Sequence, residues 1–85
     1  MMSKIKILDC TLRDGGYIND FHFTKRGIQT IIAQLTSAKI DIVECGFLED
    51  GNNDPEYSLY TSVEQIAEVL PSQRNQHTMY VAMAC

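Results

Sequence analysis

The sequence predicts an α/β fold with a parallel sheet built in the order βαβαβ, and two observations lead to that prediction. Three short apolar runs, at residues 4–8, 40–47 and 79–84, have the length and composition of strands. Two segments whose apolar residues have helical spacing separate these runs. Strands that alternate with helices of about 10 to 15 residues indicate βαβ units, and right-handed crossovers then give a parallel sheet.

The first strand and the first helix are predicted in the first half of the chain. The strand KIKIL (residues 4–8) stops at the turn DCTLRDGG, where two glycines let the backbone turn sharply and leave space for a ligand. Thr24 is a suitable N-cap for the helix, and Phe23 and Ile28 have the spacing of a hydrophobic staple. One face of this helix is apolar and should lie on the sheet: Ile28, Ile31, Ile32 and Leu35.

Two further strands are predicted on either side of a second helix. The strand IDIVECGF (residues 40–47) is rich in β-branched residues, and the run MYVAMA (residues 79–84) has the length of a strand. Residues 48–60 contain Gly, Asn, Asp and Pro, a composition that predicts a loop without regular structure.

The second helix is expected to begin at about residue 62 and to end at Pro71. Two capping-box pairs compete for its start, Thr61 with Glu64 and Ser62 with Gln65. Its expected apolar face consists of Val63, Ile66, Ala67 and Leu70.

The composition narrows the classes of function. With 85 residues, 45% hydrophobic and 21% charged, the chain has the size and composition of one small globular domain. A net charge of −4 argues against nucleic acid and membranes as partners, since both nucleic acid and acidic membranes select basic surfaces. Three cysteines without metal-binding spacing, and no apolar run long enough for a signal peptide or a membrane span, predict a soluble cytoplasmic protein with reduced thiols.

Functional groups gather where two of the predicted strands end. Active sites of parallel α/β folds lie at the carboxyl ends of the strands, where the DCTLRDGG and ECGF stretches stand. Arg13 offers a forked cation for a carboxylate or an enolate oxygen, and Asp14 offers hard oxygen ligands for Mg²⁺ or Mn²⁺. Glu44 could hold Arg13 in a charge-assisted pair. Taken alone, these features are equally consistent with a structural ion pair.

The run DCTLRDGG, followed by Glu44 in IVECGF, resembles the start of the DRE-type TIM-barrel metallolyases. This family includes hydroxymethylglutaryl-CoA lyase, isopropylmalate synthase and 4-hydroxy-2-oxovalerate aldolase. The sequence DCTLRDGGY looks most like that of the aldolases. The resemblance implies a divalent metal, Mn²⁺ or Mg²⁺, bound by Asp14. It also implies that Arg13 binds and stabilises an enolate oxygen, and that Glu44 orients the arginine and the water shell of the metal.

Two departures from the family pattern affect this site. The aldolases commonly carry a histidine base three residues after the metal-binding aspartate, where this chain has Tyr17, as a proton carrier or as a hydrogen-bonding wall of the pocket. The family completes its metal site with a His-x-His pair, which this sequence lacks. We expect His77 at the opposite end of the sheet and His22 at the rim, so the metal site should be incomplete. Asn19 is a candidate substrate ligand.

A TIM barrel takes eight βα units and about 250 residues, so residues 1–85 are expected to form its first three strands, the N-terminal part of one incomplete catalytic domain. The first hypothesis is that the longer protein cleaves a 4-hydroxy-2-oxo acid to pyruvate, or a related 2-oxo acid, and an aldehyde, while the short chain alone is inactive. An acyl-CoA-dependent condensing enzyme of the same family is the alternative. A third hypothesis is a non-catalytic fragment that associates through its exposed sheet edges, as a homo-oligomer or with a complementary fragment.

Overall fold

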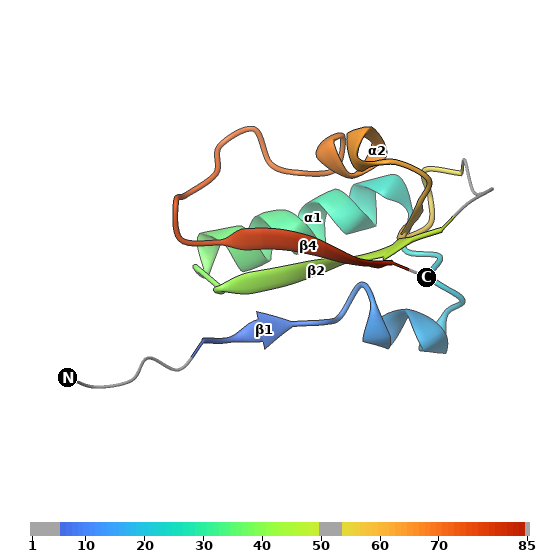
Figure 1. Ribbon diagram of the computed structural model, residues 1–85, viewed down its shortest axis with the longest axis horizontal. Helices are drawn as coiled ribbons and strands as arrows, with labels where there is room; N and C mark the ends of the chain where they lie inside the picture. The colour runs from blue at the N-terminus through green and yellow to red at the C-terminus, as the bar shows by residue number, and fades with distance from the viewer. Residues whose placement is uncertain (1–5, 50–53, 85) are drawn as a thin grey trace.

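A parallel sheet with helices packed against it makes up the described part of the chain, residues 6–49 and 54–84 of a computed structural model (Figure 1). The elements in order are β1 (Leu8–Asp9), the 3₁₀ helix η1 (Asp14–Ile18), α1 (Lys25–Ser37), β2 (Ile42–Leu48), β3 (Leu59–Tyr60), α2 (Val63–Ala67) and β4 (Met79–Ala84). All strand pairings among them are parallel, so the predicted α/β fold is confirmed.

The strand β2 is the centre of the sheet. β1 pairs with its first residues and β3 with its last residues, while β4 pairs along its whole length. Because a strand has only two edges, β1 and β3 share one edge of β2 and β4 takes the other. The end of β1 therefore lies beside the first residues of β2, and the loop after β1 runs along the rest of that strand.

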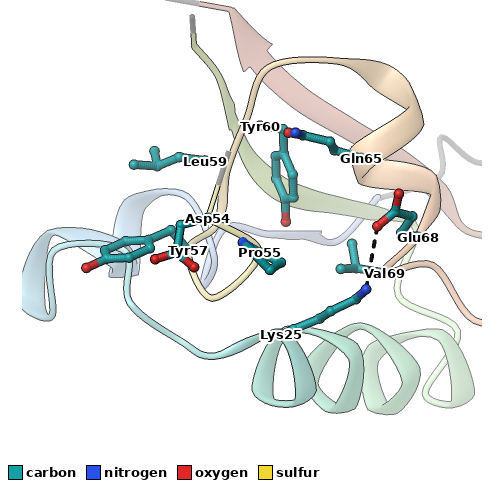
Figure 2. Close-up of a pocket in the computed structure, with 9 residues that line it drawn as sticks. All are labelled: Lys25, Asp54, Pro55, Tyr57, Leu59, Tyr60, Gln65, Glu68 and Val69. Carbon is teal, nitrogen blue, oxygen red and sulfur yellow. Dashed lines mark hydrogen bonds and ion pairs between the residues drawn. The ribbon is translucent and has the colours of Figure 1, made fainter. Parts of the chain in front are cut away.

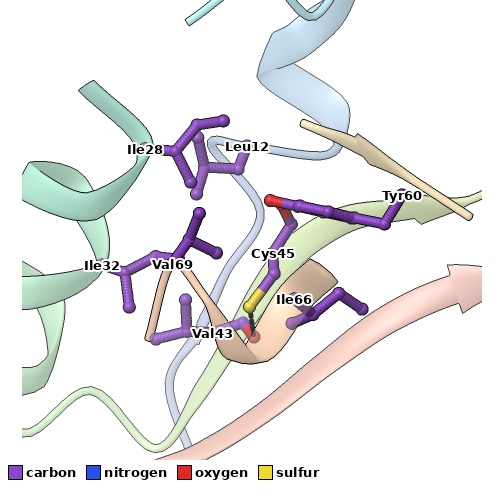
Figure 3. Close-up of a cluster of buried hydrophobic side chains, with 8 residues drawn as sticks. All are labelled: Leu12, Ile28, Ile32, Val43, Cys45, Tyr60, Ile66 and Val69. Carbon is purple, nitrogen blue, oxygen red and sulfur yellow. Dashed lines mark hydrogen bonds between the residues drawn. The ribbon is translucent and has the colours of Figure 1, made fainter. Parts of the chain in front are cut away.

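The hydrophobic core lies between the helices and one face of the sheet (Figure 3). Ile28 and Ile32 of α1 are fully buried against it, which confirms the predicted apolar face of that helix. Since side chains alternate along a strand, Val43 and Cys45 enter this core and Glu44 between them points to the other face. The buried core residues are Leu12, Ile28, Ile32, Val43, Cys45, Tyr60, Ile66 and Val69.

Both helices begin at capped residues that the sequence indicated. Thr24 caps α1, its side-chain oxygen accepting a backbone N–H three residues on at 3.0 Å. At α2 the Ser62 oxygen accepts the N–H of Gln65 at 3.3 Å, so this pair is the cap and not Thr61 with Glu64. The Gln65 side chain in turn accepts the N–H of Thr61 at 2.7 Å.

The second helix is shorter than predicted. It ends at Ala67 instead of continuing to Pro71, and the N–H of Val69 bonds to the carbonyl three residues back at 3.0 Å. After this tighter turn Val69 lies in the core. The predicted apolar face is confirmed at Ile66 and Leu70, which pack in or against the core, and wrong at Val63 and Ala67, which are exposed.

The prediction of an irregular loop over residues 48–60 is wrong at its end, where β3 forms. The N–H of Phe47 bonds to the Ser58 carbonyl at 3.1 Å, and the N–H of Glu49 to the Tyr60 carbonyl at 2.7 Å. These bonds provide partners for the backbone N–H groups of β2 beyond the point where β1 stops. Tyr60 is thereby buried in the core. Residues 50–53 of the predicted loop lie outside the described residues.

The predicted strand bounds are confirmed for 79–84 and shifted for the others. Part of the predicted strand 4–8 lies outside the described residues, and β1 begins later because the N–H of Ile7 donates to the side chain of Asp41 rather than to a backbone carbonyl. The second strand begins at Ile42 rather than at residue 40.

Candidate functional site

The segment between β1 and η1 carries Arg13 and turns as a single tight loop. The N–H groups of Arg13, Asp14 and Gly15 all donate to the carbonyl of Cys10, at 3.1, 2.7 and 3.2 Å. The turn is sharp, as predicted, but the predicted open space is absent at Gly16: this residue is buried, and a Cβ there would lie 2.0 Å from the ring of Phe21. An aromatic side chain occupies the space predicted for a ligand.

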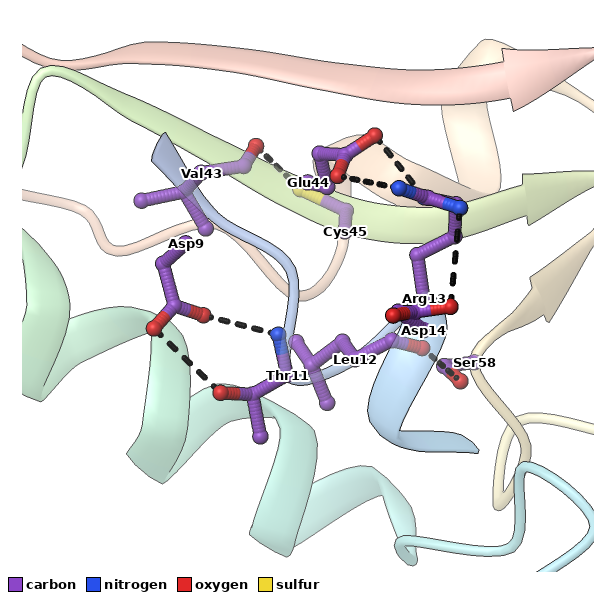
Figure 4. Close-up of polar contacts among 9 residues, drawn as sticks. All are labelled: Asp9, Thr11, Leu12, Arg13, Asp14, Val43, Glu44, Cys45 and Ser58. Atoms are coloured by element: carbon purple, nitrogen blue, oxygen red, sulfur yellow. Dashed lines mark hydrogen bonds and ion pairs between the residues drawn. The ribbon is translucent and has the colours of Figure 1, made fainter. Parts of the chain in front are cut away.

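Arg13 and Glu44 form a two-pronged ion pair just past the end of β1 (Figure 4). Nε of Arg13 donates to Oε2 of Glu44 at 2.9 Å, and Nη2 donates to Oε1 at 3.0 Å. The side chains are 22% and 8% exposed, so the pair is largely shielded from water. The hydrogen bonds that Arg13 donates to Glu44 raise the pKa of Arg13 above its usual value, which keeps the cation charged. The predicted proximity of these residues is confirmed, but Glu44 lies within β2 and not at its end as predicted, because β2 continues to Leu48.

Asp14 lies beside this pair but is bound loosely. Its Oδ1 is 3.9 Å from Nη1 of Arg13, and its side chain is 65% exposed. It is accessible to a cation, and a carboxylate is a suitable ligand for Mg²⁺ or Mn²⁺. Across residues 6–49 and 54–84, however, no group of three or more His, Cys, Asp or Glu side chains could hold a metal ion. The described residues thus provide one ligand and not a complete metal site.

Tyr17 belongs to an aromatic cluster at the same rim. Its ring meets that of Phe21 edge-on at 5.0 Å, and Phe21 meets Phe47 at 5.5 Å. Tyr17 is 66% exposed, and Asn19 close by donates through Nδ2 to the carbonyl of His22 at 3.2 Å. Phe21 and Phe47 were not predicted as neighbours of Tyr17, and the available signal was one aromatic residue in the segment after β1 and another near the end of β2.

The two histidines lie apart from Arg13 and Glu44. His77 pairs with Asp41 at the amino end of β2, which is the opposite end of the sheet, as predicted. The ring of His22 packs against Tyr57 at a centroid distance of 4.9 Å. Neither histidine replaces the missing pair of metal ligands.

A cavity of about 190 Å³ lies between the start of α1, residues 54–60 and α2 (Figure 2). Its walls include Tyr60 and the ion pair between Lys25 and Glu68, whose charged atoms are 3.5 Å apart. Neither Arg13 nor Glu44 lines it. The cavity is therefore on the helix side of the sheet and does not serve the candidate site.

Comparisons with known proteins indicate which superfamily the chain resembles. The chain is 38% identical over 71 residues to "2-isopropylmalate synthase" of Oceanobacillus iheyensis, a match that covers 84% of this chain and 13% of that protein. The proteins of the same name from Polaromonas naphthalenivorans and Cupriavidus pinatubonensis are 36% and 34% identical over 70 residues, covering 82% of this chain and 13% of theirs. The similarity supports the DRE-type metallolyase superfamily. It does not support the aldolases as the most similar group, because these relatives are named as synthases.

The match covers only a small part of each relative. The chain spans about 13% of the length of the curated relatives named above. No family model matches the sequence, and no solved structure matches it. None of the helices in residues 6–49 and 54–84 is long and apolar enough to cross a membrane.

Proposed function

We propose that the full-length protein containing this chain is a condensing enzyme that joins an acyl-CoA to a small 2-oxo acid. The Arg13–Glu44 pair, which joins the loop after β1 to β2, is the observation that carries this proposal. The similarity to proteins named 2-isopropylmalate synthase favours condensation over cleavage. Residues 1–85 would be the N-terminal part of one TIM-barrel domain of a cytoplasmic protein.

The chemistry requires a fixed cation next to an oxyanion. A base takes a proton from the carbon beside the thioester carbonyl, and the carbon of the resulting enolate attacks the ketone carbon of the 2-oxo acid. The ketone oxygen takes the negative charge and is then protonated. Water finally cleaves the thioester of the product, which releases the CoA thiol. Arg13 donates to Glu44 through Nε and Nη2, while within the described residues Nη1 has only the loose contact with Asp14. Nη1 is therefore the donor that could meet the developing oxyanion.

The other residues of the site would assist Arg13. Glu44 holds the guanidinium in place, so its donors need not reorganise during the reaction. Tyr17 would carry a proton or form a wall of the pocket. Asn19 would contact the substrate through its side-chain oxygen, since its nitrogen bonds to His22.

A divalent ion, Mn²⁺ or Mg²⁺, would take Asp14 as one ligand and would polarise a substrate oxygen. Because the described residues provide no further ligands beside Asp14, we assign no reaction step to the ion. If the ion takes part, EDTA should abolish turnover of the full-length protein and Mn²⁺ should restore it. An Asp14→Asn variant should then need a higher Mn²⁺ concentration for half-maximal activity.

The experiment is an assay of the full-length protein with Mn²⁺ and acetyl-CoA. Release of free CoA thiol in the presence of a branched 2-oxo acid is measured for the wild type and for Arg13→Ala. Thiol release that depends on the 2-oxo acid and is lost in Arg13→Ala supports the proposal. Turnover no greater than that of Arg13→Ala would end it.

Retro-aldol cleavage is a second candidate function, favoured by the run DCTLRDGGY that resembles the aldolases. Here Arg13 would stabilise the enolate of the departing 2-oxo acid. The same protein preparation should then release pyruvate from a 4-hydroxy-2-oxo acid without consuming acetyl-CoA. The two candidate functions are therefore distinguished by whether acetyl-CoA is consumed.

We also propose that the chain associates with another copy or with a fragment, because apolar side chains are exposed on the face of the sheet opposite the helices. Leu8, Met79 and Met83 on β1 and β4 are 51%, 57% and 42% exposed. Apolar side chains this open favour association. Sedimentation of the 85-residue chain tests this, and a well-behaved monomer with cooperative unfolding would contradict it.

A further inference from the structure

Ser58 is fully buried, and each of its polar groups bonds to a different segment. Its hydroxyl donates to the carbonyl of Leu12 at 2.7 Å. Its N–H donates to the carbonyl of Phe21 at 2.9 Å, and its carbonyl accepts the N–H of Phe47 at 3.1 Å. One residue therefore ties the loop after β1, the segment before α1 and the end of β2 together.

The hydroxyl bond is the one that reaches Arg13. Leu12 is fully buried, so its carbonyl depends on a partner inside the protein, and Ser58 provides it (Figure 4). That carbonyl belongs to the peptide unit that leads into Arg13, whose own N–H bonds to Cys10 at 3.1 Å. The backbone from which the guanidinium extends is thus held on both sides of one peptide bond.

The end of β2 is shaped to admit Ser58. Gly46, two residues after Glu44, has a φ of 140°, and a Cβ there would lie 2.0 Å from the Ser58 carbonyl oxygen. Only glycine gives the backbone this conformation and this approach. The strand that carries Glu44 and the loop that carries Arg13 are therefore both fixed against the same residue.

We propose that Ser58 is a positioning residue for the reaction put forward above: its hydroxyl sets the Leu12–Arg13 peptide so that the guanidinium stays on Glu44. The effect on turnover rests on the proposed function, whereas the effect on the geometry of Arg13 does not. Ser58 touches none of the reacting groups, and it acts only through the backbone.

The test compares Ser58→Ala with Thr36→Val in the full-length protein. Thr36 is a matched control because its hydroxyl is also buried and bonded, to the carbonyl of Ile32 at 2.8 Å and to the hydroxyl of Tyr80 at 2.7 Å, away from the site. With acetyl-CoA and a 2-oxo acid, Ser58→Ala should lower kcat by about tenfold to a hundredfold with little change in KM. Thr36→Val should keep kcat within about twofold of the wild type.

A second readout does not require turnover. In protein labelled with ¹⁵N-arginine, the Nε–H signal of Arg13 is assigned by its loss in Arg13→Lys, and its exchange with water is measured. The hydrogen bond to Glu44 should make that exchange slow in the wild type and in Thr36→Val, and faster in Ser58→Ala.

These readouts separate the two proposals. An unchanged Arg13 signal in Ser58→Ala overturns the positioning role, whatever happens to kcat. A wild-type protein without turnover overturns the proposed function, while the signal still decides the role of Ser58. If Ser58→Ala does not fold, Ser58→Cys, which keeps a weak donor of similar size, is judged by the same signal.

Discussion

Two charged pairs join β2 to its neighbours, and the pairs differ in burial. Just past the end of β1, Glu44 of β2 is 8% exposed and its partner Arg13 is 22% exposed. Just before β2 begins, Asp41 is 17% exposed and its partner His77 is 52% exposed. The Arg13–Glu44 pair is thus held away from water, whereas the Asp41–His77 pair leaves one of its side chains in water.

The two pairs also differ in how their charges respond to pH. Because the pKa of Arg13 is raised, its contribution to folding is complete at neutral pH and is lost only when the pH rises through that high value. In the second pair, the hydrogen bond from the N–H of Ile7 lowers the pKa of Asp41. The Arg13–Glu44 pair therefore offers a constant cation for chemistry, whereas Asp41 provides a link between strands that weakens at low pH.

The largest expected effect is on turnover, in Glu44→Gln. The amide can accept only one of the two bonds from Arg13, so the guanidinium loses its fixed position and kcat should fall by about a hundredfold or more. His77→Gln, which changes the partner of Asp41 before β2, should keep kcat within about twofold of the wild type. Steady-state assays measure kcat for both variants, and similar losses of kcat in the two would contradict the comparison.

A smaller effect, on stability, is expected for Gly46→Ala at the carboxyl end. The added Cβ meets the Ser58 carbonyl, and the φ of 140° is strained for alanine, so the free energy of unfolding should fall by about 1 to 3 kcal/mol. Gly15→Ala is the control, since its Cβ would lie 3.8 Å from Thr11, an ordinary contact, and the change should stay within about 0.5 kcal/mol. Urea unfolding measures both, and equal losses would contradict the account.

A pH-dependent effect is expected for Asp41→Asn at the amino end. A lowered pKa in the folded state means that the carboxylate stabilises the protein above its unfolded pKa, and that this stabilisation is lost as the pH falls through the folded value. Between about pH 5 and pH 2 the variant should therefore lose less stability than the wild type. Urea midpoints across this range test it, with Thr36→Val as an uncharged control, and parallel curves for Asp41→Asn and the wild type would exclude the effect.

The smallest effect is expected for His77→Ala. His77 is half exposed, so its ion pair with Asp41 is screened by water, and the melting temperature at pH 8 should change by no more than about 2 °C. A loss larger than this would show that the pair with Asp41 is not screened, and would contradict the account.

Local patterns in the sequence were sufficient for much of this fold. The periodicity and N-cap of α1 and the bounds of β4 follow from spacing. The pairing of Arg13 with Glu44 was predicted from strands that end at one edge, but it forms because β1 stops beside Val43, which brings the loop after β1 next to Glu44 within β2. Metal binding by Asp14 and the roles of Tyr17 and Asn19 stay predictions.

What the sequence did not indicate depends on contacts between distant segments. β3 forms because Phe47 and Glu49 need partners for their N–H groups, and no local propensity in residues 48–60 expresses that need. Ser58 sits in a polar run that is typical of a loop, and its burial arises only when Leu12 and Gly46 close around it. The same applies to Phe21, whose ring fills the space over Gly16.

The most direct test of the account is the turnover of Arg13→Lys in the full-length protein with acetyl-CoA and a 2-oxo acid. Lysine keeps the charge but lacks the fork that binds Glu44 and presents Nη1 to the oxyanion. The account predicts a fall in kcat of about a hundredfold, with KM for acetyl-CoA within about threefold of the wild type. A lysine variant that turns over within about threefold of the wild type would contradict it.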